Sequence, residues 1–411
     1  MRTIIIALMS FALSSFSNES QAGSWETDSI AVQAIIDNNG LAGIDYSQEF
    51  FSTRDSSNRI IALHLSYASL KMLPPEIGLL TKLEVLNLRQ NQLTTLPPEI
   101  GQLRNLKVLD LDNNNLTSLP RETGQLVNLS TMNLSKNDLS SLPGDIGGLI
   151  NLTVLRLSGN RLTAVPPEIG QLASLAHLDL SDNGLTVLPP ELFSLSNLIE
   201  LRVSDNALST VSREIANLSS LSILDISNNR LTDFPSGIFE IFYLERLFIN
   251  NNRIGLIGSE IINLKYLDMV KADSNDLSSL DPGITNMEYS AFSISGNRLC
   301  EIPSEVYYWL VYSTGNLSWL QTQKCNAVPV VVPDDQEASF AGDVSQNTYS
   351  LRSDVTMRSA WMYNAKGEVI EHFDAINSAS LTWDITNRTA GAYFIKIKTD
   401  NDLFVKKLLI E

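Results

Sequence analysis

Apolar residues recur through the middle of the chain at a fixed spacing of 23 residues. Leucine holds the first position of nine consecutive units, at Leu83, Leu106, Leu129, Leu152, Leu175, Leu198, Leu221, Leu244 and Leu267. Ile60 opens the series, and Tyr289 closes it after a last step of 22 residues. Positions 1, 4, 6, 11, 14, 18 and 21 of a unit are apolar, with Thr123 an exception at position 18. A constant period of this length predicts a stack of repeated units.

The apolar positions 1, 4 and 6 predict a short strand in every unit. Alternate residues of a strand point to opposite sides, so positions 4 and 6 face inward while positions 3 and 5 face outward. One unit cannot bury its own apolar side chains, but eleven stacked units cover one another and pair their strands in a parallel sheet. The pattern therefore predicts a curved solenoid.

Two further positions of the repeat hold the same residue type in most units, and we expect a structural role for both. Asparagine holds position 9 in ten of the eleven units, at Asn91, Asn114, Asn137, Asn160, Asn183, Asn206, Asn229, Asn252, Asn275 and Asn297. A side-chain amide both donates and accepts hydrogen bonds, so we expect this column to satisfy backbone groups at the turns of successive coils. Proline holds position 15 in eight units, including Pro74 and Pro97. Its fixed φ favours a 3₁₀-like or extended segment on the side opposite the sheet.

The repeated sequence LxxLxLxxNxLxxLPxEIGxL, which begins at Leu83, resembles that of the leucine-rich repeat proteins. The resemblance covers residues 60–310, or eleven repeats. It implies an α/β solenoid, a leucine-rich repeat horseshoe with a parallel β-sheet on its concave face. It also implies recognition of a protein, although a fold does not by itself fix a function.

Residues 1–22 are predicted to be a secretory signal peptide. Arg2 supplies the positive start, Ile4 to Leu13 are mainly apolar, and Ser20-Gln21-Ala22 resembles a cleavage site. Residues 23–59 are expected to form a helical cap on the first coil. Within this cap, Asp28 is expected to be the N-terminal capping residue of a helix that ends near Gly40.

Two cysteines follow the last repeats. Cys300 and Cys325, with the tryptophans between them, resemble the cysteine-bearing C-terminal cap of secreted bacterial leucine-rich repeat proteins, which places this cap at residues 311–326. In an exported chain such a pair is expected to form a disulfide. A redox pair and a nucleophilic cysteine are the alternatives, but the chain has no CxxC motif and no nearby histidine.

Residues 327–339 are predicted to be a linker, and residues 340–411 a small all-β sandwich. Short runs such as Ala392 to Lys398 alternate apolar and polar residues, as half-buried strands do. The runs Trp361 to Val369 and Gly391 to Ile397 resemble the C-terminal sorting domain of the type IX secretion system, although the usual Pro-Asn-Pro opening is absent. This resemblance implies contact with a secretion apparatus. A permanent accessory sandwich is the alternative.

The amino-acid composition disfavours several classes of function. The chain has 29 basic and 46 acidic residues and a formal net charge of −17, which disfavours a nucleic-acid partner. Three histidines and two cysteines leave little material for imidazole, thiolate or zinc chemistry. We therefore expect no enzyme, no metal site and no cofactor. A catalytic cysteine domain, as in leucine-rich repeat ubiquitin ligases, is not expected because the tail is strand-like and contains no cysteine after Cys325.

The residues most open to a partner are those on the outward side of the predicted sheet. The partner-binding candidates are Arg156, Asp179, Arg202, Asp225, Arg246, Phe248 and Lys271, of which Arg156, Arg202, Arg246 and Phe248 are the expected anchors. Arginine and aromatic side chains dominate the energetics of protein interfaces. The sequence thus predicts an exported, monomeric binding module that recognises a protein or another extracellular macromolecule through its concave face. A structural or adhesive cell-surface component without a single specific partner is the alternative.

Overall fold

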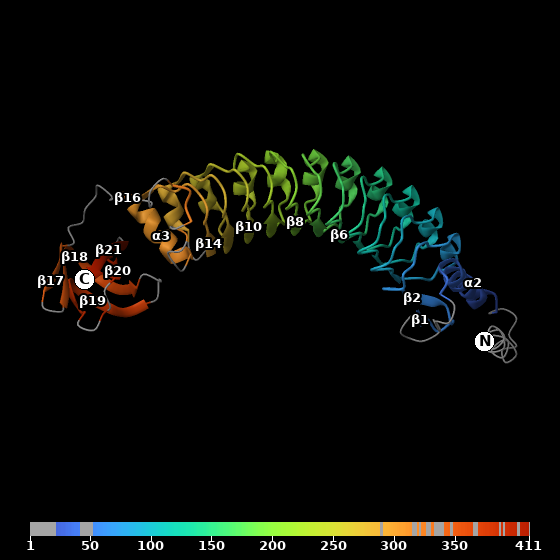
Figure 1. The fold of residues 1–411 in the computed structure, drawn as a ribbon, viewed down its shortest axis with the longest axis horizontal. Helices are drawn as coiled ribbons and strands as arrows, with labels where there is room; N and C mark the ends of the chain where they lie inside the picture. The colour runs from blue at the N-terminus through green and yellow to red at the C-terminus, as the bar shows by residue number, and fades with distance from the viewer. Residues whose placement is uncertain are drawn as a thin grey trace. The chain divides into compact units, whose positions relative to one another are not determined.

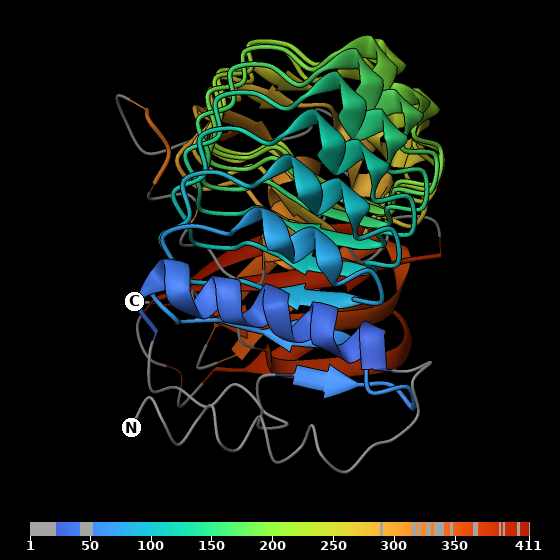
Figure 2. The same cartoon turned by 90° about the vertical axis from the view of Figure 1, so that its right-hand side faces the viewer.

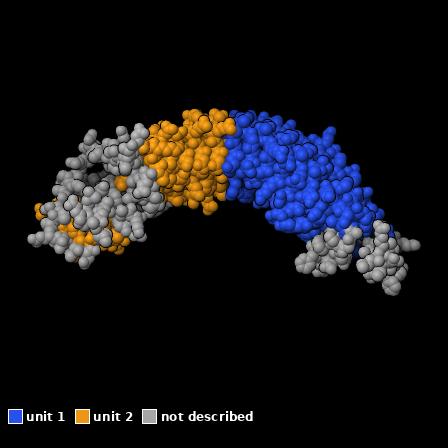
Figure 3. All heavy atoms as spheres, in the orientation of Figure 1, with its two compact units in different colours: residues 1–208, 214–221 blue, residues 209–213, 222–411 orange. Residues whose placement is uncertain are grey.

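The computed structural model describes residues 22–41, 52–287, 291–314, 319, 322–325, 330–332, 341–345, 348–364, 369–385, 388, 391–400 and 403–410. The chain divides into two compact units (Figure 3). Unit 1 contains residues 1–208 and 214–221, and unit 2 contains residues 209–213 and 222–411. Residues 1–21 of the predicted signal peptide lie outside the described residues.

Unit 1 is a stack of coils that each contribute one short strand. Its strands are β1 (Ser52–Arg54), β2 (Ile60–His64), β3 (Val85–Asn87), β4 (Val108–Asp110), β5 (Thr131–Asn133), β6 (Val154–Arg156), β7 (His177–Asp179) and β8 (Glu200–Arg202). Strands β2 to β8 pair in parallel and in sequence order, so the predicted parallel sheet is confirmed. Strand β1 pairs antiparallel with β2, which the repeat pattern does not predict because β1 precedes the first repeat.

The segment opposite each strand is a 3₁₀-helix, as the proline column predicts. These helices are η1 (Pro75–Leu79), η2 (Pro98–Gln102), η3 (Arg121–Gln125), η4 (Gly144–Gly148), η5 (Pro167–Gln171), η6 (Pro190–Ser194) and η7 (Arg213–Asn217). Pro97 precedes η2 with φ −71°, close to the value that the proline ring enforces. In unit 1 the strands lie on the inner side of the curve and the 3₁₀-helices on its outer side (Figure 1).

The apolar positions of the repeat form the core. Leu106, Leu109, Leu111 and Leu116 are completely buried, as are their equivalents in the neighbouring coils. Full burial of one leucine side chain is worth about 1.5–3 kcal/mol, so this periodic core supplies the main driving force for stacking. Thr123 is also completely buried, although its position is isoleucine in most coils.

The backbone conformation limits the choice of residue at position 8 of the repeat. This position has a positive φ in every coil, at Tyr67, Gln90, Asn113, Lys136, Gly159, Asp182, Asp205, Asn228, Asn251, Ser274 and Gly296. The left-handed region is costly for most L-residues and is best tolerated by Gly, Asn and Asp. These residue types make up most of the column, so turn geometry limits the choice at this position.

The asparagines at position 9 bond to backbone groups of two successive coils. The Nδ2 of Asn137 donates to the carbonyl of Leu134 in its own coil and to that of Leu111 in the preceding coil, at 3.0 Å each. Its Oδ1 accepts from the backbone N–H of Leu116 at 2.9 Å. Because these backbone groups are buried, each asparagine replaces hydrogen bonds that water would otherwise supply.

The N-terminal cap is the helix α2 (Ala22–Asn39), which lies across the first coils (Figure 2). The expected capping role of Asp28 is wrong, because Asp28 lies inside α2. Its completely buried carboxylate accepts from the Ile60 backbone N–H at 2.7 Å and pairs with Arg59 at 2.9 Å. At the end of α2, the side chain of Asn39 bonds to the backbone of residues 71 and 72. These contacts fix α2 on the first repeat.

Unit 2 contains coils of the same kind. Its strands β9 (Ile223–Asp225), β10 (Arg246–Phe248), β12 (Met269–Lys271) and β14 (Ala291–Ser293) pair in parallel. A second parallel pair is formed by β11 (Leu256–Ile257) and β13 (Ser279–Leu280). The 3₁₀-helices are η8 (Ser236–Glu240), η9 (Ser259–Asn263) and η10 (Pro282–Asn286).

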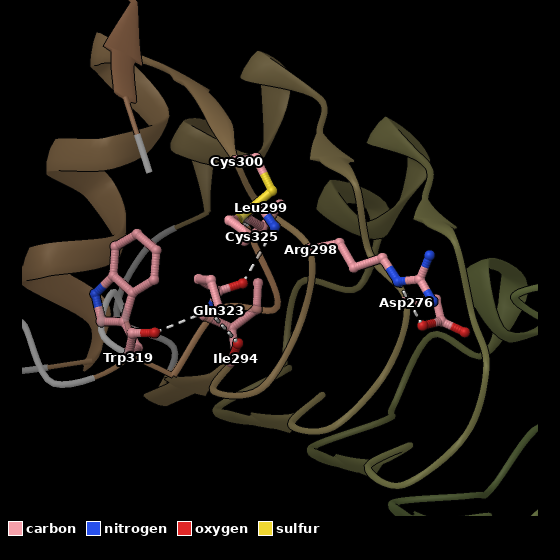
Figure 4. The surroundings of a disulfide bond; sticks show 8 residues. All are labelled: Asp276, Ile294, Arg298, Leu299, Cys300, Trp319, Gln323 and Cys325. Carbon is pink, nitrogen blue, oxygen red and sulfur yellow. Dashed lines mark hydrogen bonds and ion pairs between the residues drawn. A yellow bond between two sulfur atoms is a disulfide. The ribbon is translucent and has the colours of Figure 1, made fainter. Parts of the chain in front are cut away.

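Helix α3 (Ser304–Thr314) and a disulfide follow the last coil (Figure 4). The Cys300–Cys325 bond has an S–S distance of 2.07 Å. Beside it, Oε1 of Gln323 accepts from the backbone N–H of Leu299 at 3.1 Å, as the asparagine of a following coil would do. Its Nε2 donates to the carbonyl of Ile294 at 3.2 Å. Gln323 therefore ends the asparagine column, a role that sequence analysis did not assign.

Part of the expected linker is ordered. Residues Val330–Val332 form β16, which pairs in parallel with β15 (Glu301–Pro303). The chain then forms one antiparallel sheet from β17 (Ala341–Ser345), β18 (Thr348–Asn364), β19 (Val369–Asp384), β20 (Gly391–Lys398) and β21 (Leu403–Ile410). The all-β tail is confirmed. No helix among the described residues is long and apolar enough to cross a membrane.

Candidate functional site

The outward side chains of the sheet in unit 1 arise directly from its three-residue strands. In β7, the central Leu178 is buried, whereas His177 and Asp179 on either side of it are partly exposed. The parallel register places His177 beside Glu200 and Asp179 beside Arg202. Equivalent outward positions of neighbouring coils therefore lie about one strand spacing, ~4.8 Å, apart. We call the surface that such outward side chains form on the strands of each unit the inner sheet face.

A hollow with a volume of about 240 Å³ opens on the inner sheet face across β6, β7 and β8. We call it the polar hollow. Its lining residues are Leu155, Arg156, His177, Leu178, Asp179, Glu200 and Arg202. The two leucines form the floor because their side chains are buried in the core, so the five ionisable side chains form the accessible surface.

Glu200 is the centre of the charge network in the polar hollow. Its Oε2 lies 3.0 Å from Nδ1 of His177, and its Oε1 accepts hydrogen bonds from the guanidinium of Arg202. Burial alone would raise the pKa of the Glu200 carboxyl, but the hydrogen bonds from His177 and Arg202, together with their charge, hold that pKa below its ordinary value. Glu200 therefore remains ionised in the folded protein.

Arg156 and Asp179 lie in register on β6 and β7. The carboxylate of Asp179 accepts from the backbone N–H of Ser181 at 3.0 Å. Arg156 is exposed, and its guanidinium has no hydrogen bond or ion pair with any residue that the structure describes. All five of its N–H donors are thus without a partner among the described residues.

Of the candidates predicted from sequence, Arg156, Asp179 and Arg202 come together in the polar hollow. Sequence analysis missed His177 and Glu200 as members of the same site. The signal was present at position 3, where the four preceding coils hold Val85, Val108, Thr131 and Val154 and the next two hold His177 and Glu200. The change from mainly β-branched to ionisable residues at this position marks the place of His177 and Glu200 on the outward side of the sheet.

The other candidates lie on the sheet of unit 2. The Nζ of Lys271 lies 5.5 Å from the ring centroid of Phe248, a cation–π contact between β12 and β10. Asp225 accepts hydrogen bonds from the backbone N–H and the hydroxyl of Ser227, at 3.0 and 2.6 Å. Arg246 is exposed on β10. Within the described part of the chain, no three His, Cys, Asp or Glu side chains are arranged to hold a metal ion.

Family models match three parts of the chain. "Leucine rich repeat" matches residues 104–162 and 173–231, and "Leucine Rich repeats (2 copies)" matches residues 81–122. "Secretion system C-terminal sorting domain" matches residues 345–411. Both resemblances that the sequence predicts are thereby confirmed. None of the curated proteins compared with the chain matches it.

Solved structures of leucine-rich repeat proteins are similar to the chain. A leucine-rich repeat protein of Leptospira interrogans is 32% identical, with 58% of this chain and 73% of that chain covered and a TM-score of 0.48. A TDR receptor is 28% identical, with 61% of this chain and 50% of that chain covered and a TM-score of 0.53. The leucine-rich repeat domain of APL1B is 21% identical, with 69% and 92% covered and a TM-score of 0.49. The chain spans about half the length of the TDR receptor chain.

The repeat matches coincide with the coils of the parallel sheet, and the sorting-domain match coincides with β18 to β21. A sorting domain of this kind directs a protein out of the cell. The chain is therefore an exported leucine-rich repeat protein, secreted or held at the cell surface, with a C-terminal sorting domain of the type IX secretion system.

Proposed function

We propose that the protein binds a protein or another extracellular macromolecule through its inner sheet face and does not act as an enzyme. The observation that carries this proposal is the polar hollow. The polar hollow presents five ionisable side chains from the neighbouring strands β6, β7 and β8, and the N–H donors of Arg156 have no partner among the described residues. A guanidinium without an internal partner keeps all of its donors for a ligand and recognises carboxylates in a bidentate manner.

The proposed contact residues are Arg156, Asp179, Arg202, Asp225, Arg246, Phe248 and Lys271, together with His177 and Glu200. A polar surface of mixed charge favours a protein-sized partner over a small apolar ligand, because small-molecule sites are mostly apolar and enclosed. The polar hollow is open and lined by charged groups. Leucine-rich repeats are binding scaffolds in general, which agrees with this assignment.

The tail has a separate role in this proposal. Residues 340–411 direct secretion or surface attachment through contact with the secretion machinery, and the match to the sorting domain supports this. We assign the remaining regions as signal peptide (1–22), N-terminal cap (23–59), repeats (60–310), C-terminal cap (311–326) and connecting segment (327–339). Binding then belongs to the repeats and localisation to the tail.

Charge reversal tests the proposed binding surface. The variant Arg156→Glu, Arg202→Glu, Arg246→Glu is expected to abolish capture of partners from the surface of the native cells, measured by cross-linking and mass spectrometry. A matched control changes Arg104, Arg121 and Arg161 to Glu; these lie off the inner sheet face, and the change in net charge is the same.

Equal capture by both triple variants would place the site elsewhere. If neither variant changes capture but removal of residues 340–411 releases the protein from cells, the protein is a structural or adhesive surface component. In both cases, circular dichroism must first show that the variants keep the fold of the parent protein.

A further inference from the structure

Three aromatic side chains lie together on the surface of unit 2, outside its strands. Phe242 and Tyr243 follow η8, and Tyr266 follows η9, in the segments that lead from each 3₁₀-helix to the next strand. They are 51%, 55% and 52% exposed. Their ring centroids lie 5.1 Å (Phe242–Tyr243), 5.3 Å (Phe242–Tyr266) and 5.7 Å (Tyr243–Tyr266) apart. A cluster of half-exposed rings is an unusual surface for a soluble domain.

This cluster replaces a hydrogen-bonded column that other coils possess. Position 23 of the repeat is Asn105, Asn128, Asn151, Ser174 and Asn197 in five successive coils. Each of these side chains donates to a backbone carbonyl of the preceding coil, at 2.7 to 2.9 Å. Tyr243 and Tyr266 hold the same position 46 and 69 residues after Asn197. A tyrosine cannot make this short bond, so the two coils lack a stabilising contact and expose aromatic surface instead.

Two carboxylates lie close to the tyrosines in sequence. Glu245 and Asp268 each follow a tyrosine by two residues, with a buried leucine between them, and both are exposed. The backbone N–H of Asp268 donates to the carbonyl of Glu245 at 2.9 Å, which places the two acids side by side. Neither carboxylate has an ion pair with any side chain that the structure describes. Two bases lie equally near in sequence, Lys265 beside Tyr266 and Arg246 beside Glu245, and Arg246 is exposed on β10.

We propose that Phe242, Tyr243, Tyr266, Glu245 and Asp268 form a second binding surface, the aromatic patch, for a cationic segment of a protein partner. The face of an aromatic ring carries a negative quadrupole that attracts arginine and lysine side chains. Unpaired carboxylates close to the tyrosines in sequence add charge-assisted hydrogen bonds to the same cation. One tyrosine and one acid recur in each of the two coils, so two equivalent sites lie about one strand spacing, ~4.8 Å, apart on the surface.

Restoring the usual residue tests this surface without disturbing the coil. In the variant Tyr243→Asn, Tyr266→Asn the new side chains are those that other coils hold at position 23, so the fold is retained. A second variant, Glu245→Gln, Asp268→Asn, removes the charges and keeps the rings. The controls are Ile150→Asn, which removes an exposed apolar side chain elsewhere, and Glu76→Gln, Glu84→Gln, which removes two other carboxylates.

The probe is a twelve-residue peptide of alternating arginine and glycine, and its uncharged counterpart contains citrulline in place of arginine. Binding to the full chain is measured by isothermal titration calorimetry at about 0.15 M salt, where long-range attraction to an acidic protein is screened. We expect the arginine peptide to bind and the citrulline peptide not to bind. Each patch variant should weaken binding about tenfold, and the controls should leave it unchanged.

Three results would overturn the proposal. Absence of binding by the arginine peptide is one. Equal binding by the patch variants and the parent protein is another, since it would show general attraction to the net charge of −17. The third is binding of soluble oligosaccharides that is lost in the tyrosine variant and kept in the carboxylate variant, which would assign the rings to a glycan. Because the surface is separate from the polar hollow, none of these results bears on the proposed function of the inner sheet face.

Discussion

Thr123 offers a sharp test of how the repeat core is stabilised. Position 18 is occupied by a completely buried isoleucine in the neighbouring coils, at Ile77, Ile100, Ile146 and Ile169. Thr123 is also completely buried, and its Oγ1 has no hydrogen-bond partner among the described residues. A buried hydroxyl without a partner costs about 1–3 kcal/mol relative to a well-solvated one. The buried hydroxyl of Thr123 therefore destabilises the folded protein, and an apolar substitution can remove it.

Thr123→Val replaces this hydroxyl with a methyl group of similar size and should stabilise the protein by about 1–2 kcal/mol. Thr123→Ile adds one further methylene, worth about 0.8 kcal/mol, in a site that accepts isoleucine in the adjacent coils. The free energy of unfolding is measured by urea denaturation with far-UV circular dichroism, with the slope m compared between variants to verify a common transition. Thr117→Val, at an exposed position, is the control and should change stability by less than about 0.5 kcal/mol.

A Thr123→Val variant that is equally or less stable than the parent would refute this reasoning. It would show that the hydroxyl is satisfied in solution, for example by a buried water molecule. A stable valine variant with an unstable isoleucine variant would instead show that the coil has no room for the larger side chain. Only the first result contradicts the assignment of Thr123 Oγ1 as an unpaired group.

Three further predictions follow from the structure. Asn137→Ala removes an amide that bonds to two successive coils and should destabilise the protein by about 3 kcal/mol in urea denaturation, whereas Asn115→Ala, at an exposed site, should not. The pKa of Glu200 is lowered in the folded state, so its ion pairs stabilise the protein above the ordinary pKa of 4.5, and this stabilisation is lost as the pH falls through the folded-state pKa. The difference in the free energy of unfolding between the parent protein and Glu200→Gln should therefore shrink below about pH 4.5. A difference that stays constant with pH would contradict the charge network. Reduction of Cys300–Cys325 should raise the intact mass by about two daltons and, by loop entropy for a sequence separation of 25, lower stability by about 3.5 kcal/mol, and an unchanged mass would exclude the bond.

The periodic part of the fold was predictable because every repeat places the same residue types at the same positions. Leucine at positions 1, 4 and 6 determines strand position and burial, and proline at position 15 favours the 3₁₀-helix. The features that sequence analysis missed depend on contacts between distant residues. Asp28 meets Arg59 across 31 residues, and Gln323 meets Leu299 across 24. No spacing rule in either segment indicates such a partner.

The candidate site was likewise predictable from the sequence only in part. Position 5 identified Arg156, Asp179 and Arg202 because residues at this position lie on the outward side of every strand. It did not reveal that Glu200 pairs with His177, because that contact depends on the lateral register of β7 and β8 at position 3. Likewise, the exposed rings of Tyr243 and Tyr266 stand out only against the hydrogen bonds that other coils make at the same position.

The reach of the asparagine bonds has an evolutionary consequence. Asn137 contacts its own coil and the one before it, and so do the equivalent asparagines in the other coils. A duplication or deletion of one 23-residue segment therefore re-creates every such bond at the new junction, and no compensating substitution elsewhere is required. Gene recombination can lengthen or shorten the array in whole repeats and shift one surface cluster relative to another in steps of about 4.8 Å. Because the asparagine bonds form again at every new junction, the number of repeats between two surface clusters can change without loss of these stabilising contacts.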